Sequence, residues 1–181
     1  NLLVELKRYD DAEQKYRQAL EIRPEDEYAW YNLARLAELK SDYEEAERCY
    51  LRAIQNSPKN SHIPNNLGLM YANMGRDDDA AAMYRKALEV DPENPLPLNN
   101  LGQLAEKRGE MEAALDYYGK ALRLKPAFLA GLNNLVALLV RLGRGAEAES
   151  WYQQALSAEP ENGDIHNSHG YFYFAQGRIE E

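Results

Sequence analysis

Four positions recur along this chain at a fixed interval of 34 residues. They hold a small residue, an aromatic residue, a second small residue and a proline, and the first three fall on one face of a helix. The copies, in that order, are Ala12/Tyr16/Ala19/Pro24, Ala46/Tyr50/Ala53/Pro58, Ala80/Tyr84/Ala87/Pro92, Ala114/Tyr118/Ala121/Pro126 and Ala148/Tyr152/Ala155/Pro160. Self-similarity at such a period indicates a repeat architecture rather than one globular core.

Each copy of the pattern predicts a pair of antiparallel helices joined by a short turn. Proline cannot continue a helix, so the second helix of each pair should end there. Glycine readily takes the left-handed conformation that ends a first helix. The glycines placed between the two helices of a pair are Gly75, Gly109, Gly143 and Gly177. Lys7 and Ser41 hold this place in the first two copies, so we expect those turns to be less favourable.

The interval divides the chain into a single array of repeats. Residues 1–26 form a partial repeat, in which we expect the tail of a helix at 1–6 and a second helix from Tyr9 to Ile22. The complete repeats are 27–60, 61–94, 95–128 and 129–162, and residues 163–181 hold the first helix of a truncated repeat. A single helix pair cannot bury its own apolar face, so the repeats must stack. The expected fold class is therefore an all-α solenoid.

The spacing and residue types resemble the tetratricopeptide repeat family. That family combines a bulky residue, Leu, Gly and Tyr in its first helix with Ala, an aromatic residue, Ala and Pro in its second, and the third repeat matches it with Leu98, Leu101 and Gly102. The resemblance covers the whole chain. It implies a right-handed superhelical solenoid whose first helices line a concave groove, and a role in binding proteins. It implies no chemistry, because a fold alone does not carry function.

The first helices repeat a run of asparagines that the family's geometry places toward the groove. The candidate peptide-binding residues are Asn32, Asn66, Asn100 and Asn134, beside Tyr31, Asn65, Asn99 and Asn133, with Arg35 and Gln103 one turn further along. A carboxamide offers a donor and an acceptor that match a peptide unit, and each hydrogen bond contributes about 0.5–1.5 kcal/mol. We therefore expect an extended peptide to be held by its backbone. The alternative is that these asparagines bond to the neighbouring helix and set repeat packing.

Three functions remain open on this surface. A protein- or peptide-binding scaffold follows from the groove itself. A similar asparagine ladder occurs in the repeat domain of O-linked N-acetylglucosamine transferase, which suggests a substrate-recognition segment of a larger enzyme. The third is a structural spacer or assembly module without a groove ligand. In each, we expect the Leu and Gly that follow the asparagines to hold one repeat against the next.

Composition argues against several other classes of protein. A net charge of −9 and a pI near 5.0 argue against nucleic-acid binding and against a polybasic membrane-surface helix. No apolar run approaches the roughly 20 residues needed to span a bilayer. Cys49 is the single cysteine, which weakly favours a reducing compartment such as the cytoplasm. We find no glycine-rich phosphate loop, nucleophile elbow or paired carboxylates, so we expect no catalytic activity and no cofactor.

Sharper binding motifs do not match. Some tetratricopeptide domains hold acidic chaperone tails with a clamp of cations and asparagines, and no window here places the cations correctly. His166 and His169 are spaced to share a metal but lack further ligands. The run Asp77–Asp79 fits a helix start better than a calcium loop. Tyr171–Phe174 lies on a first helix whose partner helix is absent, which predicts end-to-end self-association.

Overall fold

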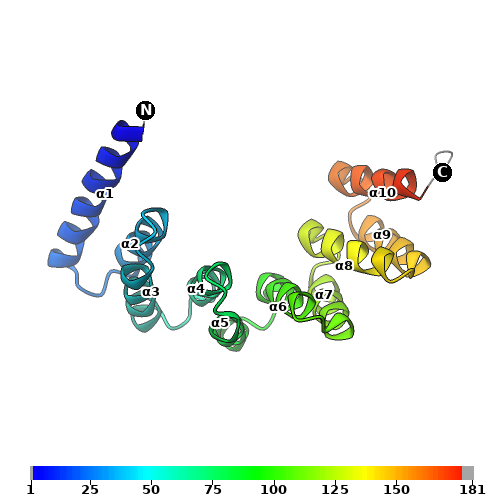
Figure 1. Ribbon diagram of the computed structural model, residues 1–181, viewed down its shortest axis with the longest axis horizontal. Coiled ribbons are helices and arrows are strands. Elements are labelled where there is room, and N and C mark those ends of the chain that lie inside the picture. The colour runs from blue at the N-terminus through cyan, green and yellow to red at the C-terminus, as the bar shows by residue number, and fades with distance from the viewer. Residues whose placement is uncertain (1, 177–181) are drawn as a thin grey trace. The chain divides into compact units, whose positions relative to one another are not determined.

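The computed structural model describes residues 2–176, and the side chains from residue 8 onward. Within this part of the chain the ordered elements are ten α-helices, with no strand. The chain forms two compact units, with the boundary after Pro92. Figure 1 shows the helices, coloured in chain order. None of the described helices is long and apolar enough to cross a membrane.

The first unit holds five helices, in which each first helix packs against the second helix of the same pair (Figure 1). They are α1 (Leu2–Ile22), α2 (Glu27–Leu39), α3 (Tyr43–Asn56), α4 (His62–Asn73) and α5 (Asp77–Val90). Asp26 and Asp42 accept hydrogen bonds from the first turns of α2 and α3, which fixes where these helices begin.

The second unit repeats this arrangement through two helix pairs and one further first helix. Its helices are α6 (Pro95–Lys107), α7 (Met111–Leu124), α8 (Leu129–Arg141), α9 (Gly145–Ala158) and α10 (Gly163–Ala175). The first helices α6, α8 and α10 contact one another in sequence, so together they form one face of the unit. The all-α solenoid of helix pairs expected from the sequence is confirmed within each unit.

The small, aromatic and second small positions form the core of each pair. In α3, α5, α7 and α9 the exposed fraction of these alanines and tyrosines lies between 0% and 3%. In α1 the corresponding residues, Ala12, Tyr16 and Ala19, are only half-buried. The periodic positions are therefore fully buried where helices pack on more than one side.

The turns between paired helices use the predicted left-handed conformation. Gly75, Gly109 and Gly143 have φ values of 76°, 78° and 72°, while Gly177 lies outside the described residues. Ser41 holds the same place with φ 60°. The left-handed region costs a residue with a Cβ about 1–2 kcal/mol relative to a right-handed one. The turn at Ser41 is thus the strained copy.

Replacing Ser41 with glycine should stabilise the first unit. The Ser41→Gly variant keeps the turn's backbone hydrogen bonds, Ser41 N to Glu38 O and Asp42 N to Ala37 O, and removes the Cβ clash. We expect the free energy of unfolding to rise by about 0.5–1 kcal/mol, measured by urea denaturation. Gly109→Ser is the matched reverse change and should lower it in the second unit. A change of the free energy of unfolding in the same direction for both variants would contradict this account of the turn.

Two expectations about local structure are wrong. The predicted break near Lys7 is absent, because α1 runs without interruption from Leu2 to Ile22; no glycine or proline occurs in this stretch to end a helix. The glycines after the asparagine run do not hold one repeat against the next. A Cβ at Gly68 or Gly102 would lie 2.6 Å or 2.5 Å from the ring of Tyr84 or Tyr118, on the second helix of the same repeat.

Candidate functional site

The predicted groove residues differ in their exposure to solvent. Asn65, Asn99 and Asn100 are buried, with 4%, 5% and 7% of their surface exposed. The half-buried members are Tyr31, Asn32, Asn66 and Asn134, and the exposed members are Arg35, Gln103 and Asn133. The most accessible row is therefore the one that contains Arg35 and Gln103, not the asparagine rows.

Two of the asparagines bond to the preceding first helix. Asn66 Nδ2 donates to the Tyr31 hydroxyl at 2.7 Å, and Asn134 Nδ2 donates to Asn99 Oδ1 at 2.8 Å. Both pairs are 35 residues apart, so the same contact recurs between stacked helices. For these pairs, a packing role is observed. Each donating carboxamide has a second N–H and an oxygen beyond this bond, so it can still form hydrogen bonds with a ligand.

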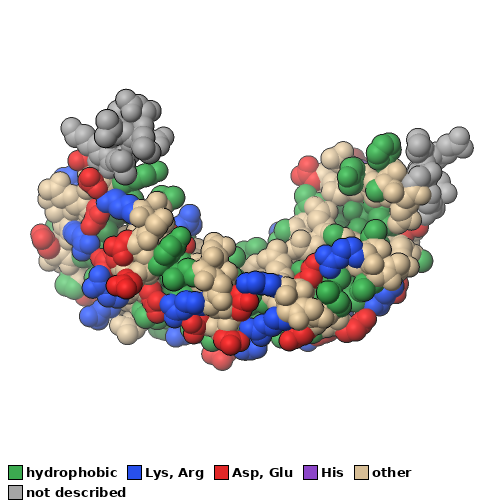
Figure 2. All heavy atoms as spheres, in the orientation of Figure 1, with side chains coloured by type: hydrophobic (Ala, Val, Ile, Leu, Met, Phe, Trp, Pro, Cys, Tyr) green, Lys and Arg blue, Asp and Glu red, His purple; other side chains and the backbone are tan. Residues whose placement is uncertain are grey.

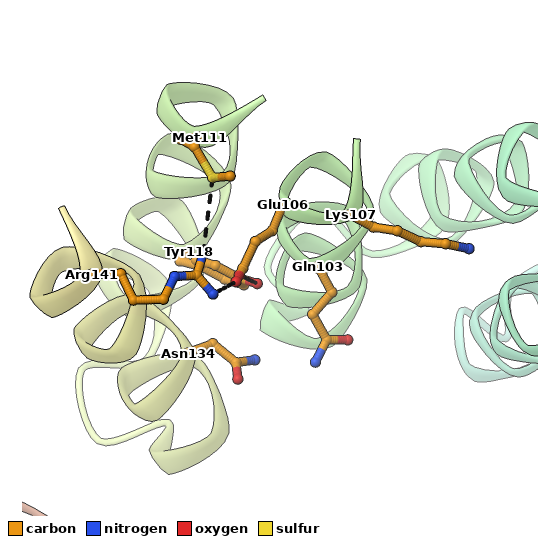
Figure 3. Close-up of a pocket in the computed structure, with 7 residues that line it drawn as sticks. All are labelled: Gln103, Glu106, Lys107, Met111, Tyr118, Asn134 and Arg141. Atoms are coloured by element: carbon orange, nitrogen blue, oxygen red, sulfur yellow. Dashed lines mark hydrogen bonds and ion pairs between the residues drawn. The ribbon is translucent and has the colours of Figure 1, made fainter. Parts of the chain in front are cut away.

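A polar groove of about 600 Å³ lies on the first-helix face of the second unit (Figure 3). We call it the α6–α8 groove. It is lined by Gln103, Glu106, Lys107, Met111, Tyr118, Asn134 and Arg141. Figure 3 shows the carboxamides of Gln103 and Asn134 pointing into the same space, while Lys107 points away from the cluster.

Glu106 organises one side of this groove. It accepts a hydrogen bond from the Tyr118 hydroxyl at 2.9 Å and pairs with Arg141 Nη1 at 2.7 Å. Arg141 also reaches the sulfur of Met111 (Figure 3). Burial and the bond to Glu106 raise the pKa of Tyr118, so its hydroxyl remains a donor at neutral pH. The Arg141 guanidinium is thereby held at the border of the groove.

The first unit contains a related cluster, which includes the predicted groove residue Arg35 but whose hydrogen bonds were not predicted from the sequence. The Tyr50 hydroxyl donates to Glu38, which lies 12 residues earlier, as Glu106 does relative to Tyr118. Arg35 pairs with Glu38 at 3.6 Å. The signal for both clusters was a glutamate at the same repeat position, two repeats apart. Burial and the bond to Glu38 raise the pKa of Tyr50.

A second groove, of about 630 Å³, lies between α8 and α10. We call it the α8–α10 groove. Its lining residues are Asn133, Val136, Ala137, Val140, Arg141, Tyr152, Asn167, Ser168, Tyr171, Phe172, Ala175 and Gln176. The Tyr152 hydroxyl donates to the Ser168 carbonyl at 3.1 Å, which fixes α10 against α9. Tyr171 is 73% exposed.

The histidines have structural contacts. His166 Nε2 lies 2.8 Å from the Pro160 carbonyl. Trp30 holds the same repeat position in α2, and its Nε1 donates to the Pro24 carbonyl. The His169 ring stacks on Tyr152 with centroids 4.5 Å apart. No cluster of three or more potential metal ligands occurs among the residues that the structure describes.

Other residues singled out by the sequence lie at helix starts or in the core. Asp77 begins α5, and Asp79 pairs with Arg76 at 2.7 Å. Cys49 is 1% exposed, and burial raises the pKa of its thiol to about 12. These contacts agree with helix-start and core roles, respectively.

The aromatic run near the C-terminal end is divided between two environments. Phe172 is buried and the Tyr173 hydroxyl donates to Glu149 at 2.9 Å, whereas Tyr171 and Phe174 are 73% and 66% exposed. Figure 2 shows hydrophobic side chains reaching the surface over α10. End-to-end self-association through this run stays a prediction.

Family models identify this class of repeat along most of the chain. Three tetratricopeptide repeat models match residues 1–61, 61–127 and 105–168. The chain belongs to the tetratricopeptide repeat family, and its helical solenoid is a protein-interaction scaffold. A comparison with curated proteins gave no match.

Solved structures share the fold at low sequence identity. PilF of Pseudomonas aeruginosa is 20% identical, with a TM-score of 0.74, over 97% of this chain and 80% of that one. A crystal structure of MamA protein is 21% identical, with a TM-score of 0.61, over 85% and 84%. The Cut9–Hcn1 hetero-tetramer of the APC/C gives 18% identity and a TM-score of 0.65 over 96% of this chain but 34% of the other. At these identities the likeness establishes the fold alone.

Proposed function

We propose that the second unit binds a partner protein by holding an extended peptide segment along the face formed by α6, α8 and α10. The observation that carries this proposal is the pair of carboxamides, Gln103 and Asn134, in the α6–α8 groove. Asn134 is oriented by its bond to the buried Asn99. Its side chain therefore loses less conformational entropy when a ligand binds. No catalytic step is assigned to this surface.

Because some of the asparagines are buried, we expect the exposed carboxamides of the groove to contact the peptide first. Asn99 and Asn100 are too enclosed to meet a peptide first, whereas Gln103 and Asn133 are exposed. Each carboxamide bond to a peptide unit contributes about 0.5–1.5 kcal/mol. A few such bonds support a weak affinity that tolerates many peptide sequences. A substrate-recognition segment of a larger enzyme would use the same surface, so that alternative stays open.

A peptide-library screen with one matched pair of variants tests the proposal. We expect the chain to select extended peptides, and Gln103→Ala to weaken the selected peptide roughly three- to tenfold, equivalent to one lost hydrogen bond. Gln153→Ala removes an exposed carboxamide from α9, outside both grooves, and should leave affinity unchanged. Calorimetry gives both values. A library without any ligand, or equal effects of the two variants, would contradict the proposal.

A further inference from the structure

The α8–α10 groove differs in chemistry from the polar groove beside it. Val136, Ala137 and Val140 line it from α8, and Tyr171 and Phe172 line it from α10. Val140 and Tyr171 are 43% and 73% exposed, although both are large apolar residues. An exposed apolar patch with polar residues around it is typical of an interaction site. The groove is therefore suited to a bulky apolar side chain.

Polar side chains line the same groove. Asn133 and Asn167 are exposed and Ser168 is half-buried, so all three can reach a ligand. Such groups can bond a peptide backbone on either side of an inserted side chain. The occupant that fits is an extended segment, because an apolar side chain enters the groove while its backbone stays among amides and a hydroxyl.

The charge of the groove indicates which residue of the ligand should follow the apolar side chain. Arg141 is the one charged residue among the described residues that line it, in a chain that carries a net charge of −9. The Arg141 side chain is 55% exposed and also lines the α6–α8 groove. Its intramolecular partner is Glu106, which lies on the α6–α8 side. A carboxylate that follows the apolar side chain would meet the Arg141 cation, for which Glu106, outside the lining of this groove, competes.

We propose that the α8–α10 groove recognises a partner segment in which a bulky apolar or aromatic residue stands next to an aspartate or glutamate. The apolar side chain lies between Val140 and Tyr171, and the carboxylate lies at Arg141. This specificity rests on the proposed peptide-binding function of the second unit. It adds to that function a site separate from the Gln103 and Asn134 carboxamides.

Calorimetry with four blocked octapeptides tests the specificity on the whole chain. The peptides share a Gly/Ser background and carry Trp-Asp, Trp-Asn, Trp-Lys or Ser-Asp at the centre. We expect Trp-Asp to bind most tightly, and loss of the indole to weaken binding at least about tenfold because its burial is lost. Replacing Asp with Asn should weaken binding roughly fivefold, the size of a partly exposed ion pair. High salt should remove the preference for Asp and leave the preference for Trp.

Two variants, each of which removes one charge of the Arg141–Glu106 pair, distinguish an effect of charge on binding from a loss of structure. Arg141→Gln should make Trp-Asp and Trp-Asn bind equally. Glu106→Gln removes the competing carboxylate from Arg141, keeps an acceptor for Tyr118, and should tighten Trp-Asp while leaving Trp-Asn unchanged. A structural role of this pair would instead lower the affinity for both peptides in both variants.

A blocking variant locates the apolar contact. Ala137 is exposed on α8 and lines the groove, so the uncharged Ala137→Trp change should weaken Trp-Asp at least about tenfold by filling it. Ala158→Trp adds the same side chain at an exposed position outside the groove and should have no effect.

The outcomes separate this inference from the proposed function. Equal binding of Trp-Asp and Trp-Lys, or insensitivity to Ala137→Trp, overturns the specificity. If none of the four peptides binds while library peptides do so in a Gln103-dependent way, the specificity is wrong and the proposed function stands. If neither set binds, both are wrong.

Discussion

Gly102→Ala should lower the free energy of unfolding of the second unit by about 1–3 kcal/mol, the usual cost of an overpacked core. The added Cβ would meet three atoms of the Tyr118 ring at 2.5, 2.6 and 3.0 Å. Tyr118 is buried, so its ring cannot move aside without disturbing α7. Guanidinium denaturation followed by tryptophan fluorescence in a Trp30→Phe background measures the change, because the remaining tryptophan, Trp151, packs against the core of this unit.

Gly170→Ala is the matched control for this prediction. Gly170 holds the same repeat position in α10, but a Cβ there meets nothing within 4 Å. Alanine is the better helix former, by about 0.5–1 kcal/mol. We therefore expect this variant to be as stable as the parent protein or more stable. If both substitutions destabilise the unit to the same extent, the close approach of Gly102 to Tyr118 is not the cause.

Asn134→Ala should cost about 1–3 kcal/mol of stability although the residue is only half-buried. The substitution leaves the buried Asn99 Oδ1 without the N–H that it accepts at 2.8 Å, and an unsatisfied buried acceptor is expensive. Gln103→Ala, in the same groove but exposed, should change stability by less than about 0.5 kcal/mol. Chemical denaturation of the two variants compares them directly.

A double-mutant cycle identifies the origin of that cost. If Asn134 acts through Asn99, the Asn99→Ala/Asn134→Ala variant should be more stable than the sum of the single changes predicts, by about 0.5–3 kcal/mol. Strict additivity would show that the two side chains stabilise the unit independently. The cycle also shows how far a loss of peptide binding in Asn134→Ala reflects a disordered groove rather than a lost ligand contact.

Much of the fold follows from the sequence because each repeat has nearly the same surroundings. Ala114, Tyr118 and Ala121 occupy one helical face, and an amphipathic helix packs such a face against its neighbours. Their burial was therefore predictable from spacing alone. The left-handed turn at Gly109 was predictable for a local reason, since glycine takes that conformation without a steric penalty. The absence of a turn near Lys7 shows the limit of the pattern, because the period marked a place where no residue breaks the helix.

The exposure of the asparagines was settled only by tertiary structure. Asn99 and Asn133 hold the same repeat position, yet Asn99 is buried and Asn133 is exposed. Asn99 lies against α8, where Asn134 donates to it, whereas the residue in the matching position of α10 is Ser168, with a shorter side chain, beside an open groove. The sequence by itself determined the helix pairs and their buried faces, which depend on local spacing. Which polar side chains meet solvent was decided by the stacking of α6, α8 and α10, because that exposure depends on the neighbouring helix rather than on the residue itself.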